Sequence, residues 1–142
     1  MCIRDRSGNT PEAVAGAPAR FMSLLDTYRQ KCPECVIVVS SLPPAIDAKQ
    51  NENTKWFNEQ IKHYVEDLAK DDDEHVLFVD ANTGISMEDD MWTDGVHPND
   101  LGYAIIGQRI AAAIEEADNR QWITPAIRKR AEETRVARPF TA

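Results

Sequence analysis

The sequence lacks long hydrophobic runs, an excess of positive charge and a dense set of cysteines. No apolar stretch reaches the roughly 20 residues that a membrane-spanning helix requires. The formal net charge is −8, from 16 basic and 24 acidic side chains, which argues against nucleic-acid binding and against an anionic membrane surface. Three cysteines are too few for a scaffold built on disulfides. The remaining composition, 42% hydrophobic in 142 residues, is that of one globular domain.

The two ends of the chain differ from its middle. Residues 1–9 contain a short charged segment without the apolar region of a signal peptide, and they resemble a translated adapter sequence. We interpret them as a non-native leader. A signal peptide, if a longer parent protein is secreted, would then be missing from this sequence, so the localisation stays open. Residues 118–142 are rich in arginine and poor in large apolar side chains, so we interpret them as a basic tail or linker in which 126–137 could form a helix. The predicted domain is therefore 10–117.

Helical and strand patterns alternate within this domain. Apolar side chains at steps of three and four predict helices over 12–31, 54–70 and 100–117. Pro18 is expected to kink the first helix or to shift its start. The expected N-terminal caps are Thr10, Asn53 or Thr54, and Asn99 or Asp100. Residues 45–52 are predicted to be a polar loop, and the acidic run 71–74 a solvated turn.

Two short runs rich in β-branched residues, 35–40 and 75–80, predict strands that are covered on both faces. Helices between them require parallel pairing and right-handed crossovers. Two strands alone make a poor sheet. The predicted fold class is therefore α/β, as the C-terminal part of a flavodoxin-like three-layer α/β/α sandwich with parallel strands, truncated at its N-terminus.

Cys32 and Cys35 have the spacing of a redox motif. Thioredoxin-like motifs follow a strand and open a helix, whereas this pair follows a helix and opens a strand, so no helix N-terminus favours the thiolate. Two cysteines are also only half of a zinc site, and His63 and His75 show no convergence with other ligands. We interpret Cys32 as a turn residue and Cys35 as a buried thiol, and we predict no metal site.

The segment between the second strand and the last helix holds the best candidates for chemistry. Asp94 lies three residues before His97, where parallel α/β sheets gather their sites. Pro98 keeps His97 in an extended conformation. An aspartate at this position can orient one imidazole nitrogen and leave the other as a general base. By spacing alone, a simple turn and helix cap remains the alternative. Trp92 is expected either to line a substrate pocket or to anchor the loop.

The block Asp94-Gly95-Val96-His97-Pro98 resembles the last conserved block of SGNH hydrolases, the GDSL-type esterases and lipases. Its continuation through Gly102 and Tyr103 is similar to members that act on small esters and carbohydrate acyl groups. The resemblance covers about 10–117. It implies that Asp94 is the acid and His97 the base of a catalytic triad, that the substrate is a small ester or an acylated carbohydrate, and that no cofactor is used.

The sequence departs from the family in its first blocks. The Gly-Asp-Ser nucleophile block is absent, and Asn9 is only a weak match to the oxyanion-hole asparagine. Ser40 and Ser41 end a strand and are expected to bond to the backbone or to line an acyl pocket, while Ser86 has less support still. The resemblance thus implies a serine esterase fragment that is inactive alone. The alternative is a non-catalytic α/β interaction module with a structural Asp-x-x-His turn. The oligomeric state stays undetermined.

Overall fold

A computed structural model of the chain describes residues 10–71, 74–92, 94–126 and 129. The predicted leader with Asn9, and nearly all of the predicted helix over 126–137, lie outside these residues. Of the described helices, none is both long and apolar enough to span a lipid bilayer.

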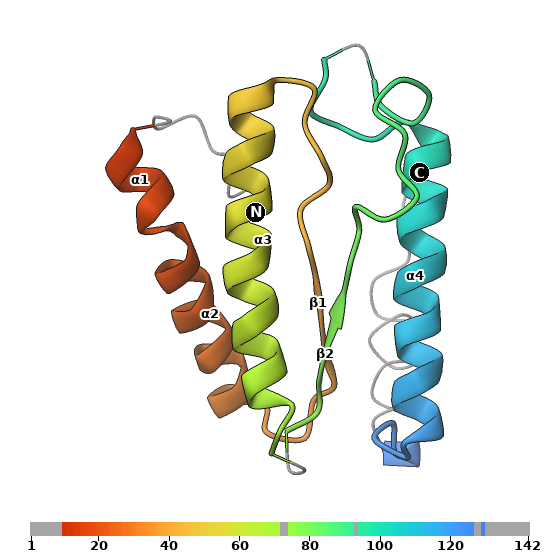
Figure 1. Cartoon of the computed structure of the whole chain (residues 1–142). Coiled ribbons are helices and arrows are strands. Elements are labelled where there is room, and N and C mark those ends of the chain that lie inside the picture. Colours follow the sequence, from red (N-terminus) through yellow and green to blue (C-terminus); the bar gives the residue numbers. More distant parts are fainter. Residues whose placement is uncertain (1–9, 72–73, 93, 127–128, 130–142) are drawn as a thin grey trace.

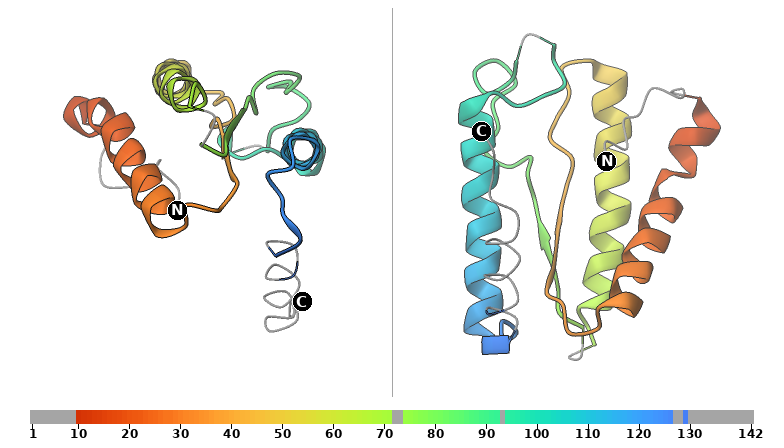
Figure 2. Two further views of the ribbon diagram at one scale, coloured as in Figure 1. Left: turned by 90° about the horizontal axis from the view of Figure 1, so that it is seen from below. Right: turned by 180° about the vertical axis from the view of Figure 1, so that it is seen from behind.

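The described residues form three layers around a parallel pair of strands. Strands β1 (Ile37–Ser40) and β2 (Val76–Val79) lie side by side in the same direction, with Ile37 opposite Val76. Helices α2 (Ala17–Lys31) and α3 (Ala48–Leu68) lie on one side of them, and α4 (Asp100–Asn119) on the other (Figures 1 and 2). The predicted α/β class with parallel strands is confirmed.

The first predicted helix is divided in two. Helix α1 (Pro11–Ala15) is capped by Thr10, whose side chain accepts a hydrogen bond from the backbone N–H of Ala13. Helix α2 then begins after Gly16, with Pro18 in its first turn. Proline fits there because the first-turn N–H groups have no partner within the helix. The expected shift of the helix start at Pro18 is therefore confirmed.

The prediction of a loop over 45–52 is wrong for most of its length. Helix α3 begins at Ala48, and its cap is Asp47, whose carboxylate accepts the N–H of Gln50 at 2.8 Å. Neither Asn53 nor Thr54 is the cap, and Thr54 is buried within the helix. The first turns of α3 are polar, so they carry no apolar stripe, but an aspartate cap stabilises a helix start without one.

The core lies between the helices and the strands. Helix α3 contributes Ile61 and Val65, each 1% exposed, together with Phe57. The ring of Phe57 meets Phe21 of α2 edge to face, with the centroids 6.0 Å apart. These side chains pack with Val39 and Val76 of the strands and with Leu25 of α2. The apolar stripe that the sequence predicts on 54–70 is thus the face of α3 that packs against the sheet.

A polar cluster ties α2 and α3 to the start of β2. The Arg29 guanidinium is paired with Glu74 and, at 2.8 Å, with Asp26, which also accepts the Tyr64 hydroxyl at 2.6 Å. The hydrogen bond from Arg29 holds the pKa of Glu74 below its ordinary value. Glu74 is therefore not part of a solvated turn, because it is half-buried in an ion pair between elements that are 45 residues apart.

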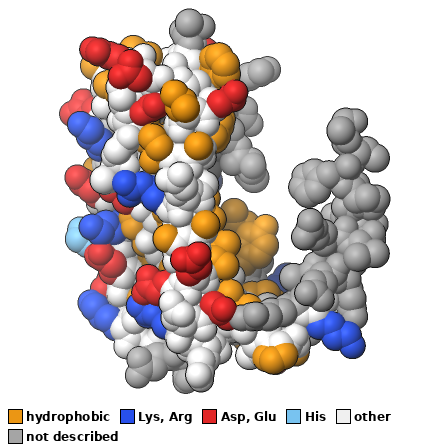
Figure 3. Space-filling model, turned by 90° about the vertical axis from the view of Figure 1, so that its right-hand side faces the viewer, with side chains coloured by type: hydrophobic (Ala, Val, Ile, Leu, Met, Phe, Trp, Pro, Cys, Tyr) orange, Lys and Arg blue, Asp and Glu red, His pale blue; other side chains and the backbone are white. Residues whose placement is uncertain are grey.

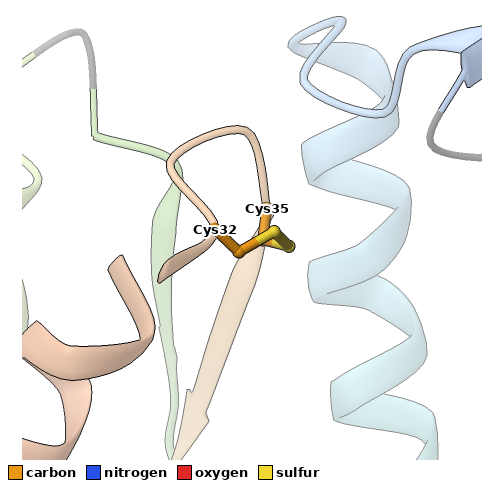
Figure 4. The surroundings of a disulfide bond; sticks show 2 residues. All are labelled: Cys32 and Cys35. Carbon is orange, nitrogen blue, oxygen red and sulfur yellow. A yellow bond between two sulfur atoms is a disulfide. The ribbon is translucent and has the colours of Figure 1, made fainter. Parts of the chain in front are cut away.

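The two neighbouring cysteines form a disulfide (Figure 4). Cys32 follows α2 and Cys35 precedes β1, with their Cα atoms 5.3 Å apart. The expected buried thiol at Cys35 is wrong, since the residue is exposed and bonded to Cys32. The backbone N–H of Cys35 also donates to the carbonyl of Cys32 at 3.0 Å, so the same turn is closed twice.

The last helix reaches beyond the predicted domain end at residue 117. Helix α4 continues to Asn119, and Trp122 stacks on His75 with the ring centroids 4.9 Å apart. The Arg120 guanidinium lies 4.9 Å from the Trp122 ring. The first residues of the segment 118–142 thus pack on the start of β2. Seen from the α4 side, the surface mixes hydrophobic with charged side chains (Figure 3).

Replacing Ile61 by alanine should lower the free energy of unfolding by about 2–5 kcal/mol, because it leaves a cavity between α3 and the sheet. The matched control is Ile114→Ala on α4, where the side chain is 47% exposed and the change should stay within about 0.5 kcal/mol. Urea unfolding followed by circular dichroism measures both. Equal effects of the two substitutions would contradict the packing described here.

Candidate active site

The loop between β2 and α4 closes on itself at its base. Met91 and Pro98 form an antiparallel bridge, and the N–H of Trp92 donates to the carbonyl of His97 at 2.9 Å. The N–H of Asn99 donates to the carbonyl of Asp90 at 2.8 Å. The two limbs of the loop are therefore paired through their backbones, and residues 94–96 lie at the tip.

Asp94 and His97 meet at this tip. Nδ1 of His97 lies 2.8 Å from Oδ2 of Asp94. The other oxygen, Oδ1, accepts the backbone N–H groups of Val96 at 2.8 Å and of His97 at 3.0 Å. Both side chains are more than half exposed. Because Nδ1 faces the carboxylate, Nε2 is the ring nitrogen left for a further partner.

Hydrogen bonding keeps the Asp94 carboxyl ionised. The backbone N–H of His97, its ring and the N–H of Val96 lower the pKa of Asp94 to about 2. Hydrogen bonds to a charged carboxylate favour that form, and here they do so without burial. Asp94 therefore carries a full negative charge beside His97 throughout the neutral and weakly acidic range.

The tip is attached to the loop that follows β1. Gly95 has φ of +67°, a conformation that side chains rarely adopt, and a methyl group on it would lie 3.0 Å from Cβ of Ile46. The backbone N–H of Ile46 donates to the carbonyl of Gly95 at 2.9 Å. Both loops leave the carboxyl ends of the strands, at the top of Figure 1. No sequence pattern points to Ile46, because its contact depends on the meeting of two loops about 50 residues apart.

Of the two strand-end serines, Ser41 is held within the structure. It is 5% exposed, and its Oγ accepts the N–H of Ala81 at 2.7 Å and the side-chain amide of Asn82 at 3.2 Å. The Oγ of Ser40 donates to the carbonyl of Ser41 at 3.1 Å. Ser41 thus joins the ends of β1 and β2. The bonding to the backbone that the sequence predicts for these serines is seen at both positions.

The other candidates are distributed around the loop. Ser86 accepts the N–H groups of Glu88 and Asp89 in a local turn. The Trp92 side chain is 51% exposed, next to the tip. His63 is exposed on α3. In the part of the chain that the structure describes, no three histidine, cysteine, aspartate or glutamate side chains are grouped as metal ligands would be.

A family model for the GDSL-like lipase/acylhydrolases matches residues 9–110. The chain belongs to this family. The match includes the strands, all of α2 and α3, and the loop with Asp94 and His97. A comparison with curated proteins gives no match.

Two solved structures share the fold of this GDSL-like chain. One is an acetyl esterase mutant with an acetate ion, and the other is a carbohydrate esterase family 3 protein from Talaromyces cellulolyticus. Each has a TM-score of 0.63 and 19% sequence identity over 72% of this chain. The match covers 49% of each solved chain, so the present chain corresponds to about half their length.

The Asp94 carboxyl should titrate with a midpoint near pH 2, which carbon-detected NMR can follow. Because the folded pKa is lowered, the stability contributed by Asp94 is complete above pH 4 and is lost as the pH falls through about 2. His97→Ala should raise the midpoint only in part, since the backbone N–H groups remain. A midpoint for Asp94 near 4 would contradict the hydrogen bonding described.

Proposed function

We propose that the chain carries the acid and the base of a Ser-His-Asp triad in a carboxylic ester hydrolase. The observation that supports this most directly is the hydrogen-bond distance of 2.8 Å between Nδ1 of His97 and Oδ2 of Asp94. It occurs in a family of lipases and acylhydrolases, in a loop beyond the carboxyl end of a parallel strand. The roles assigned are Asp94 as the triad acid and His97 as the base.

The chemistry follows from the two ring nitrogens. With Nδ1–H donating to Asp94, Nε2 carries the lone pair and accepts the proton of a serine hydroxyl as that oxygen attacks the ester carbonyl. The negative carboxylate stabilises the imidazolium that results. The same proton then passes to the departing alcohol, and water hydrolyses the acyl-enzyme by the same route. His97 is thus restored at the end of each cycle.

A purely structural turn is the second candidate, and one observation favours it. Oδ1 of Asp94 accepts two backbone N–H groups, as an aspartate does in an ordinary turn. That turn, however, needs only one carboxylate oxygen. The contact between Oδ2 and the His97 ring is additional to it, and it is the one a general base requires. We therefore prefer the catalytic role over a non-catalytic interaction module.

The nucleophile belongs, in this proposal, to a segment outside the chain. Among the described residues, no serine hydroxyl is hydrogen-bonded to His97, and Ser41 is already engaged by Ala81 and Asn82. The sequence also has no Gly-Asp-Ser block. The chain alone would then form no acyl-enzyme. Upstream codons that encode a Gly-Asp-Ser block after a strand would support the placement of the nucleophile outside this chain.

The proposed substrate class is a small ester or an acylated carbohydrate. The solved structures that share the fold are described as an acetyl esterase and a carbohydrate esterase. Trp92 is half exposed and lies five residues before His97, and its backbone N–H donates to the backbone carbonyl of His97 at 2.9 Å. An indole face at that position can stack on a sugar ring. We assign Trp92 to substrate binding on this basis.

The isolated chain should hydrolyse p-nitrophenyl acetate no faster than its His97→Ala variant. In an extended chain that includes the nucleophile block, Asp94→Ala and His97→Ala should each lower kcat by about 10³–10⁴-fold, because the base loses its orientation or is missing. Asp89→Ala and His63→Ala, which change exposed residues of the same types, should keep full activity.

Two results would count against the proposal. Turnover by the isolated chain that His97→Ala abolishes would show that the nucleophile lies within it. Full activity of both Asp94→Ala and His97→Ala in the extended chain would favour the structural turn instead.

Trp92→Ala in the extended chain should raise KM for an acylated sugar about 10-fold or more while changing kcat little, because a lost stacking contact weakens binding in ground and transition state alike. Trp92→Phe should keep most of the affinity. The comparison substrate is p-nitrophenyl acetate, which has no sugar ring and should show a smaller change. An unchanged KM for the sugar ester would exclude Trp92 from substrate binding.

A further inference from the structure

We propose that Gly102 of α4 is a positioning residue for the Asp94–His97 pair, because the base of the loop rests directly on its backbone. This inference rests on the proposed function, since the geometry it sets matters for ester hydrolysis only if Asp94 and His97 act as acid and base. Among the described residues, no hydrogen bond joins Gly102 to the side chain of Asp94 or of His97, so its effect on the pair is indirect.

The pair cannot be held in place by burial. The side chains of His97 and Asp94 are 57% and 52% exposed, and the hydrogen bonds of the carboxylate all lie within residues 94–97. Such a tip keeps its own shape, but nothing in it sets its position relative to the sheet. That position has to come from the base of the loop and from the contact with Ile46.

The base of the loop is the buried part. Pro98, which directly follows His97, is among the least exposed side chains, and Asp90 is 8% exposed. The side-chain carboxylate of Asp90 accepts the backbone N–H of Ser86 at 2.8 Å. The backbone carbonyl of Asp90 accepts the backbone N–H of Asn99 at 2.8 Å. Both limbs of the loop, at Asp90 and at Pro98, therefore enter the interior at one point.

Gly102 lies at that point. It is buried, and a methyl group in place of its hydrogen would lie 2.5 Å from the carbonyl oxygen of Asp90 and 2.8 Å from Cβ of Pro98. The first distance is to a backbone atom, so no side chain could move aside to relieve it. Only a residue without Cβ allows α4 to approach both limbs this closely.

The cap of α4 holds the same junction from the other side. Oδ1 of Asn99 accepts the N–H groups of Leu101 at 2.9 Å and of Gly102 at 3.1 Å. The side-chain amide of Asn99 donates to the carbonyl of Asp89 at 2.6 Å. Asn99 thus joins the start of α4 to the first limb of the loop, and Gly102 lies against both limbs, at Asp90 and at Pro98. A displacement here moves His97 with Pro98.

The chain offers a matched control in Gly107. It lies in the same helix, and a methyl group added to it would meet nothing within 4 Å. Glycine is unfavourable inside a helix, so Gly107→Ala should stabilise the fold. Gly102→Ala makes the same chemical change at a position where the loop stands in the way. Comparing the two substitutions therefore distinguishes the effect of helix propensity, which both share, from the effect of displacing the loop, which only Gly102→Ala has.

The test is amide hydrogen exchange in the isolated chain, with no substrate and no activity needed. In Gly102→Ala, protection of the Trp92 and Asn99 N–H groups should fall about tenfold or more relative to Val39 and Val79 in the strands. The pKa of the Asp94 carboxyl should stay at about 2, because its hydrogen bonds all lie within residues 94–97 and move with the tip. Gly107→Ala should change neither measurement.

In the extended chain, Gly102→Ala should lower kcat about 10–100-fold at unchanged KM, as a displaced general base does. Should Gly102→Ala fail to fold, the double variant Gly102→Ala/Gly107→Ala supplies the missing helix stability for the same measurements. Wild-type exchange and wild-type kcat in Gly102→Ala, or equal losses in both glycine variants, would overturn the inference. An inactive Asp94→Ala beside a fully active Gly102→Ala would overturn it and leave the proposed function standing.

Discussion

The parallel pairing of β1 with β2 determines where every loop of the candidate site can lie. It sends both strands toward the same edge of the sheet, so the segments that follow them emerge together. Ser41 fastens this edge, because its backbone N–H reaches Val79 and its hydroxyl oxygen receives the N–H of Ala81. Only from there can the N–H of Ile46 meet the carbonyl of Gly95. With an antiparallel pair, these two loops would lie at opposite ends of the molecule.

The Asp94–His97 pair shows how hydrogen bonds can fix the relative orientation of two exposed side chains. One carboxylate oxygen is used to shape the turn, and the other to orient the imidazole. The two N–H donors are already fixed by the backbone of the turn, so these hydrogen bonds order one side chain, whereas an exposed ion pair has to order two. The same bonds hold the pKa of Asp94 low, so the shape of the turn and the charge beside His97 have one cause. The helix start at Asn99 then fixes where the turn ends.

How far the sequence predicts this structure depends on how local each feature is. The strands, the cap at Asn99 and the division near Pro18 follow from neighbouring residues, and they are found within two residues of their expected places. The start of α3 at Ala48 does not follow from the apolar pattern, because its first turns are polar and its cap, Asp47, lies in a segment with the composition of a loop. The apolar run that Cys35 opens predicts a buried residue, yet Cys35 lies at the exposed end of that run, bonded to Cys32.

The α/β class, the order of the elements and the three-residue spacing that lets an aspartate turn back onto a histidine all follow from the amino-acid sequence alone. Each of these depends on periodicity, capping or turn chemistry within a few residues. Three contacts become visible only in the folded chain: Glu74 pairs with Arg29, Ile46 lies against Gly95, and the loop packs on Gly102. Those contacts join segments that meet only through the packing of helices and strands, which no local sequence pattern encodes.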